Sequence, residues 1–233
     1  MTMKIKALTF DTGGTILDWH SGISNAFQKV GERHGIALDW HAVTNDYRRL
    51  AMKGIVGQVQ PAFNMDDVHR TALDAVLSKH GLDAFTARDR WHIFHAWHEL
   101  AAWPDFPTAL ERIRGKFPVI SFTMLPLALV LSVSRQNNLD WDAVISCEMI
   151  GTYKPHAKAY LTVAQWLDLE PAEILMVACH NFDLNAARAC GFKTAFVRRP
   201  DEWGQQGPPD PTPHPDCNIV VDNFFELADS LVY

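Results

Sequence analysis

Apolar positions recur with helical spacing through one long stretch of the chain. Between residues 15 and 104 they return every three or four residues, as they do on one face of an amphipathic helix. The pattern predicts four helices, near residues 23–30, 43–51, 68–76 and 86–98. Thr86 and Asp89 form the spacing of a capping box at the start of the last one. This stretch has no convincing strand pattern, so we expect a helical subdomain.

Short apolar runs with the length of buried strands occupy the rest of the chain. They lie at residues 5–10, 119–122, 143–145, 174–178, 194–197 and 219–221. Helical stretches separate the later runs, at residues 109–113, 127–133, 157–167 and 184–189. Strand–helix alternation is typical of parallel strands joined by right-handed crossovers.

These patterns predict an α/β fold with a Rossmann-like parallel-sheet core and an inserted helical cap subdomain. We expect the core to comprise residues 1–14 and 105–233, and the cap residues 15–104. Residues 200–215 are rich in proline and glycine. Because Trp203 gives this segment a large group to bury, we expect an ordered surface loop there.

Composition and charge narrow the possible partners. The 233 residues include 21 basic and 27 acidic side chains, for a formal charge of −6, which gives no basic footprint for nucleic acid or an anionic membrane. No apolar run approaches the roughly 18 residues of a membrane span. The start lacks a signal-peptide pattern, and the four cysteines show no C-x-x-C pairing. We therefore expect a soluble cytoplasmic protein without nucleic-acid or membrane partners.

Chemically active side chains follow four of the predicted strands. Asp11, Thr123 and Asp183 come just after strands, and Lys154 lies in the loop after another. Ligands of open parallel sheets bind beyond the carboxyl ends of the strands, so we expect these groups to converge. Each alone has another interpretation: Asp11 as a turn residue, Lys154 as a solvent-exposed side chain, and Asp183 as a favourable charge at a helix start.

Four motifs in order resemble those of the haloacid dehalogenase superfamily. Residues 10–18 (FDTGGTILD) resemble the first motif, an aspartate followed by glycine and threonine. Residues 119–123 resemble the second, a strand ending in a hydroxyl residue. Lys154 with Tyr160 six residues later is similar to the third, and residues 177–183 to the fourth. The resemblance spans nearly the whole chain, the cap included.

Two positions distinguish the branches of this superfamily. Most members are magnesium-dependent phosphohydrolases with a second aspartate two residues after the nucleophile and a metal-binding acid in the fourth motif. Gly13 and Cys179 stand at these positions. Magnesium needs hard oxygen ligands, for which a thiol is a poor substitute. The chain more closely resembles the L-2-haloacid dehalogenases, which implies no metal and no cofactor.

The resemblance implies two-step catalysis on a short 2-haloalkanoic acid. Asp11 would displace the halide and form an ester, and water would then release a 2-hydroxy acid. Lys154 would keep Asp11 ionised, because a nearby cation lowers the pKa of a carboxyl group. Asp183 would hold Lys154 and orient the hydrolytic water. A homodimer is a further expectation from the resemblance.

The resemblance also assigns substrate- and halide-binding positions. Thr15 and Thr123, with neighbouring backbone N–H groups, would hold the substrate carboxylate. Arg48 is the best match for the cap arginine that receives the departing halide, with Arg49 second. Tyr160 belongs to the same expected binding set.

Three positions depart from the dehalogenase pattern. Gly13 replaces an aromatic wall, Met124 an asparagine, and His180 another asparagine. His180 could donate to a halide such as fluoride, or only orient the backbone or Asp183. The alternatives to a dehalogenase with a reshaped pocket are a magnesium-dependent phosphatase of the same superfamily and a non-catalytic relative that binds small acids.

Overall fold

A six-stranded parallel sheet forms the centre of the molecule. The computed structural model describes residues 4–56, 64–205 and 207–232. The strands are β1 (Ala7–Phe10), β2 (Val119–Thr123), β3 (Ala143–Ser146), β4 (Ile174–Ala178), β5 (Lys193–Val197) and β6 (Ile219–Val221). They pair in the order β3-β2-β1-β4-β5-β6, and every neighbouring pair is parallel. The predicted α/β fold is confirmed, with strand ends within a residue or two of those expected.

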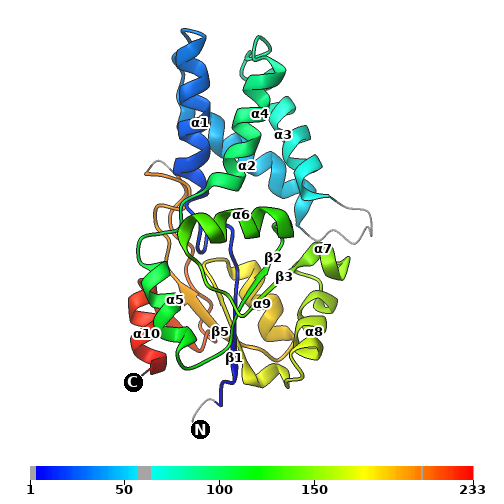
Figure 1. Cartoon of the computed structure of the whole chain (residues 1–233), viewed down its shortest axis with the longest axis vertical. Helices are drawn as coiled ribbons and strands as arrows, with labels where there is room; N and C mark the ends of the chain where they lie inside the picture. The colour runs from blue at the N-terminus through cyan, green and yellow to red at the C-terminus, as the bar shows by residue number, and fades with distance from the viewer. Residues whose placement is uncertain (1–3, 57–63, 206, 233) are drawn as a thin grey trace.

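A helical subdomain stands above one edge of this sheet (Figure 1). It consists of α1 (Trp19–Arg33), α2 (Trp40–Ile55), α3 (Met65–Lys79), α4 (Ala87–His95) and the 3-10 helix η1 (Ala96–Glu99). The helix predicted over residues 86–98 is therefore shorter and ends in a tighter turn. A bridge between Leu17 and Ala102 joins the two connecting segments. The division between cap and core at residues 14 and 104 stays a prediction.

Helices cover both faces of the sheet. They are α5 (Phe106–Arg114), α6 (Leu127–Asn137), α7 (Cys147–Ile150), α8 (Ala157–Trp166), η2 (Pro171–Glu173), α9 (Asn181–Ala189) and α10 (Phe224–Val232). Helices α5 and α10 pack together on one side, and α8 and α9 lie on the other (Figure 1). The sequence pattern does not reveal α7 or α10. No helix in the described ranges is long and apolar enough to cross a bilayer.

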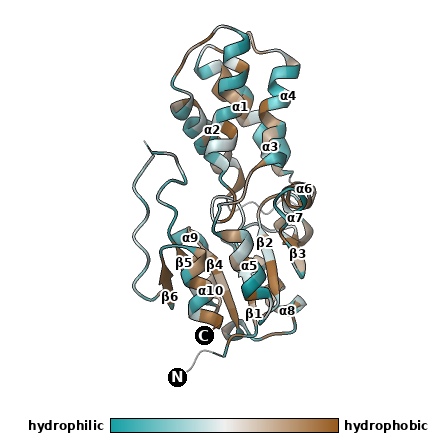
Figure 2. Ribbon diagram, turned by 60° about the vertical axis from the view of Figure 1, so that its left-hand side comes forward, coloured by the Kyte–Doolittle hydropathy of each residue, from teal (hydrophilic) through white to brown (hydrophobic). Residues whose placement is uncertain are grey.

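Aromatic rings fix the helices on the sheet, whose strands are largely hydrophobic (Figure 2). On one face Phe106 packs against Phe10 and Phe224, with ring centroids 5.8 and 4.6 Å apart. On the other face the Tyr160 ring lies 5.5 Å from Phe122. These contacts hold the strand ends, and the side chains that follow them, in fixed positions.

The loop after β5 ties the core to the cap. Arg199 donates to the Thr15 carbonyl at 2.9 Å and to both carboxylate oxygens of Asp105 at 3.0 Å. Trp203 packs edge-on against Trp19 of the cap, with ring centroids 5.0 Å apart. Trp203, expected from the sequence to be buried, is partly buried, and the loop brings its own residues to the sheet edge.

The packing of Phe106 gives a stability prediction. Its side chain is fully buried among three aromatic rings, so Phe106→Ala should lower the free energy of unfolding by about 3–5 kcal/mol. Urea denaturation measures the change. Phe225→Ala is the matched control, since Phe225 is exposed and its loss should stay within about 0.5 kcal/mol. Equal effects of the two variants would contradict the packing described.

Candidate active site

A buried lysine joins two carboxylates at the carboxyl edge of the sheet. Lys154 Nζ donates to Asp183 Oδ2 at 2.6 Å and to Asp11 Oδ1 at 3.3 Å. It also donates to the Phe122 carbonyl at the end of β2, at 2.9 Å. Lys154 is 0% exposed. The structure thus brings Asp11, Lys154 and Asp183 together, and the interpretation of Lys154 as a solvent-exposed side chain is wrong.

This contact sets the charge of Asp11. Burial alone would raise the pKa of the Asp11 carboxyl, but the charges of Lys154 and His180 outweigh it and hold that pKa below its usual range. Burial would lower the pKa of Lys154, yet Asp183 and Asp11 raise it. Asp11 is therefore an ionised carboxylate opposite a permanent cation, which is the form that a nucleophile requires.

Two of the expected substrate-binding residues instead support these charged groups. Thr15 Oγ1 donates to Asp11 Oδ2 at 2.8 Å and accepts from the Cys179 N–H at 3.1 Å. The Tyr160 hydroxyl donates to Asp183 Oδ1 at 2.7 Å. Neither residue lines the cavity in front of Asp11. Thr15 and Tyr160 therefore orient the two carboxylates.

A narrow cavity of about 10 Å³, room for about one water molecule, lies in front of Asp11, between the cap and the core. Its lining residues are Asp11, Gly13, Arg48, Met52, Met65, Thr123, Met124, Leu125, His180 and Phe182. Thr123, expected at the site, therefore lines it. This volume is far below the range for small-molecule sites, so the surrounding side chains have to move apart to admit a substrate. Mostly apolar walls with a few polar groups suit a ligand of few carbon atoms that carries one charge.

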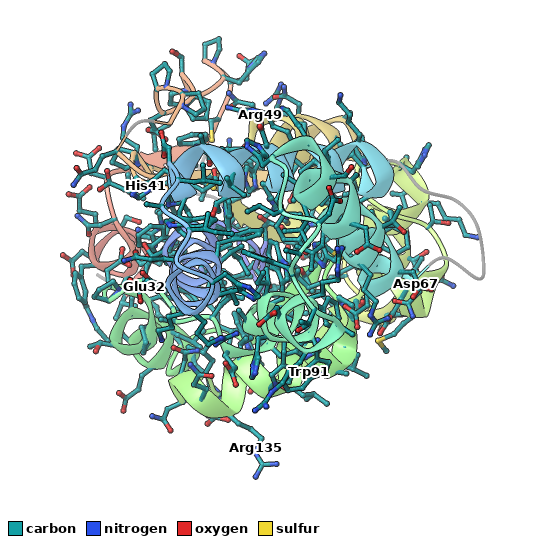
Figure 3. All side chains as sticks on the ribbon, turned by 90° about the horizontal axis from the view of Figure 1, so that it is seen from above. Glu32, His41, Arg49, Asp67, Trp91 and Arg135 are labelled. Carbon is teal, nitrogen blue, oxygen red and sulfur yellow. The ribbon has the colours of Figure 1, made fainter. Side chains whose placement is uncertain are left out.

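Arg48 reaches this cavity and Arg49 does not. Arg48 is 4% exposed, and its guanidinium lies 5.3 Å from the ring centroid of Trp19 and 5.4 Å from that of Trp97. Its Nε and one terminal nitrogen have no hydrogen-bond partner among the described residues. The Arg49 side chain is 53% exposed and pairs with Asp46, and it lies on the outside of the cap (Figure 3). Of the two alternatives, only Arg48 is placed to meet an anion beside Asp11.

His180 bridges Asp11 and a second carboxylate. Its Nδ1 lies 3.0 Å from Asp11 Oδ2, and its Nε2 lies 3.0 Å from Glu202 Oε1. Ionised carboxylates only accept hydrogen bonds, so both ring nitrogens carry a proton. Burial lowers the pKa of His180, but the carboxylates of Glu202 and Asp11 raise it well above its usual value. The ring is thus an imidazolium, in contact with the nucleophile instead of Asp183.

Glu202 is the site residue that sequence reasoning missed. It is 5% exposed, and its Oε1 also accepts from Trp19 Nε1 at 3.1 Å. Gly14, at φ +88°, permits this approach, because a Cβ there would lie 2.2 Å from Glu202 Oε1. Two features of the sequence could have pointed to Glu202: the pair of glycines after Thr12 and the acidic residue beside Trp203. Neither segment by itself indicates that Gly14 and Glu202 are in contact.

The donor atoms near the fourth motif do not suit magnesium. Cys179 Sγ, a ring nitrogen of His180 and a Glu202 oxygen lie within 4.8 Å of one another. A thiol and an imidazole favour softer metals, whereas magnesium takes oxygen ligands in octahedral geometry. Asp183 is already engaged by Lys154 and Tyr160. The residues present therefore do not fit a magnesium ion.

The chain matches the family model of the haloacid dehalogenase-like hydrolases over residues 5–191. It is 29% identical to an (S)-2-haloacid dehalogenase of Xanthobacter autotrophicus, over 84% of this chain and 76% of that protein. A crystal structure of a defluorinating L-2-haloacid dehalogenase superposes with a TM-score of 0.90 at 32% identity, covering 98% of this chain and 96% of the other. A phosphoglycolate phosphatase of Chromobacterium violaceum is 28% identical, over 82% of this chain and 84% of the phosphatase.

The raised pKa of His180 predicts a pH-dependent contribution to stability. A group whose pKa is higher in the folded state contributes its full stabilisation of the fold at pH values below its pKa in the unfolded chain, which is about 6.5 for histidine. This contribution disappears as pH rises through the pKa of the folded state. The difference in unfolding free energy between the wild type and His180→Gln should therefore shrink as pH rises above neutrality. Urea unfolding across this range measures it, with His214→Gln as a control outside the cavity. A difference that grew with pH would contradict the imidazolium assignment.

Proposed function

Because the chain belongs to the haloacid dehalogenase-like hydrolases, we propose that it hydrolyses short 2-haloalkanoic acids through an ester on Asp11, independently of any metal ion. The observation that carries the proposal is the ionised Asp11 carboxylate, held by Lys154 and facing a small cavity that Arg48 also lines. The relatives named as 2-haloacid dehalogenases support this substrate class.

In the first step, an Asp11 oxygen attacks the carbon that bears the halogen. A carbon–oxygen bond forms while the carbon–halogen bond breaks, and the halide leaves with the bonding electrons and inversion at carbon. Lys154 and Thr15 hold the carboxylate in one orientation, which lowers the entropic cost of reaching the reactive geometry. The unpaired N–H groups of Arg48 receive the halide, and Thr123 with nearby backbone N–H groups holds the substrate carboxylate.

In the second step, water attacks the ester carbonyl carbon and releases a 2-hydroxy acid. Asp11 returns to its carboxylate form, and each turnover releases one halide and one proton. Asp183 remains the partner that holds Lys154, with its second oxygen fixed by Tyr160.

The departures from the dehalogenase pattern change the shape of the cavity. A Cβ built on Gly13 would lie 3.7 Å from Leu125, an ordinary contact, so the backbone does not require glycine there. The missing side chain leaves space beside Asp11, and Met124 adds an apolar wall. We propose a small haloacid as the substrate of this cavity.

The magnesium-dependent phosphatase is the weaker alternative. A phosphate monoester carries two negative charges, which the Asp11 carboxylate would repel without a metal ion to neutralise them. The thiol of Cys179, whose pKa burial raises to about 11, is neutral at physiological pH and offers no compensating ligand. The other alternative, that the chain binds small acids without catalysis, is tested by the same assays as the dehalogenase proposal.

A homodimer and a cytoplasmic location stay predictions.

Removing the nucleophile should abolish halide release. Asp11→Asn should lower the rate on 2-haloacids by at least about 10⁴-fold, because an amide cannot displace the halide. Halide release from chloro-, bromo- and fluoroacetate and both 2-chloropropionate enantiomers is the measurement, with and without EDTA. In heavy-oxygen water, a single turnover should label the Asp11 carboxylate.

Asp67→Asn, an exposed carboxylate of the cap, is the matched control and should retain full activity. Absence of halide release by the wild type on every substrate, together with EDTA-sensitive phosphate release, would overturn the proposal.

Arg48 and Arg49 should differ sharply when each is changed to lysine. Arg48→Lys removes the planar guanidinium from between two tryptophans, so kcat/KM should fall by about 10²–10³-fold, as for loss of one preorganised donor. Arg49→Lys, outside the cavity, should leave kcat/KM unchanged. Steady-state halide release measures both. A larger loss in Arg49→Lys than in Arg48→Lys would exclude the halide role of Arg48.

A further inference from the structure

We propose that His180 is the general base that activates the hydrolytic water, with Glu202 as its positioning residue. This assignment rests on the proposed function, because it concerns the ester on Asp11. It adds a base, His180, between β4 and α9, and an acid, Glu202, from the loop after β5, to the site formed by the strand ends. The histidine exchanges its role as a hydrogen-bond donor to Asp11 for that of a proton acceptor once the ester forms.

The composition of the cavity leaves one base for the second step. Three titratable side chains of the described residues line it: Asp11, Arg48 and His180. In the intermediate Asp11 is an ester, and an arginine side chain is not deprotonated in proteins. Lys154 and Asp183 lie behind Asp11 and bind each other at 2.6 Å. His180 is therefore the group that can take a proton from water inside the cavity.

The position of the imidazole fits this task. Its Nδ1 lies 3.0 Å from Asp11 Oδ2, an atom bonded to the carbon that water attacks. A water molecule that donates to Nδ1 is therefore next to that carbon. General bases act at such hydrogen-bond distances, directly or through one water.

Formation of the ester changes the charges around His180. In the resting enzyme the ring faces two anions, Asp11 and Glu202. The other groups with electrostatic influence on this cluster are the protonated thiol of Cys179 and the cations Arg48 and Lys154. Alkylation removes the negative charge of Asp11 and leaves both cations. The imidazolium then loses its proton to solvent, which frees the Nδ1 lone pair.

Protons and electrons balance over the second step. Water gives one proton to Nδ1 as its oxygen bonds to the ester carbon, and the carbonyl electron pair moves to oxygen. Collapse of this intermediate breaks the bond to the substrate, and Nδ1 returns the proton to the departing alkoxide. Asp11 remains as a carboxylic acid and passes its proton to Nδ1, which restores the imidazolium. The proton lost to solvent earlier accompanies the halide.

Glu202 holds the ring in the orientation that the step requires. Its Oε1 accepts from Nε2 at 3.0 Å, which fixes the remaining ring proton on Nε2 and leaves Nδ1 free. Trp19 Nε1 donates to the same oxygen at 3.1 Å and fixes Glu202 in turn. A nucleophile, a base and a third group that orients the base form the arrangement found in other covalent catalysts.

His180→Ala separates the two steps. On (S)-2-chloropropionate the variant should release one halide per protein molecule in a burst and then turn over about 10²–10⁴-fold more slowly than wild type. Mass spectrometry should find the substrate residue, without its halogen, attached to the Asp11 peptide. His214→Ala is the matched control and should show wild-type turnover with no accumulated ester.

Glu202→Gln tests the positioning role through a pH profile. With a neutral partner, the pKa of His180 in the intermediate falls, so the rise of kcat with pH should move to lower pH. The halide burst should remain. Asp201→Asn, the exposed acid next in sequence, should shift nothing.

Several outcomes overturn the inference while the proposed function stands. They are wild-type turnover in His180→Ala, loss of the burst in folded His180→Ala, or an unshifted profile in Glu202→Gln. If His180→Ala does not fold, His180→Gln gives the same burst and turnover readouts, and Glu202→Gln still gives the pH profile. If the wild type itself releases no halide, the proposed function fails, and this inference fails with it.

Discussion

The ammonium group of Lys154, out of reach of solvent, is the contact on which the site depends. It touches a residue after β1, the end of strand β2 and the start of α9, so it links three segments that are distant in sequence. A buried ion pair that loses one partner leaves an uncompensated charge, at a cost of several kcal/mol. The same contact therefore holds the sheet edge together and keeps Asp11 ionised.

Charges around the cavity alternate in sign from the core outward. Asp183 faces Lys154, Lys154 faces Asp11, and Asp11 faces His180, which in turn faces Glu202. Each buried carboxylate thus has a cation beside it, which offsets much of its desolvation cost. The cap contributes one further cation, Arg48, without a hydrogen-bonded carboxylate among the described residues. An anionic ligand bound at that point would continue the alternation of charges.

Sequence patterns predicted the strands and helices in which apolar side chains recur at regular intervals or in continuous runs. Short apolar runs gave the six strands, because strands buried on both faces need continuous apolar side chains. Helix α7 has only four residues, too few for a repeat, and the sequence pattern did not reveal α10 either. Asp11, Lys154 and Asp183 could be predicted because each follows a strand of a parallel sheet. Glu202 could not, since its loop has no periodicity and its partners come from distant segments.

The close approach of Glu202 to Gly14 constrains which residues can occur at these two distant positions of the chain. A side chain at position 14 and a carboxylate at position 202 would occupy the same volume, and the left-handed backbone at position 14 disfavours any side chain. A lineage in which position 14 gains a side chain must therefore relocate or discard the acid, and the imidazole beside it then loses an anchor. We therefore expect the two positions to change together, although almost the whole chain lies between them.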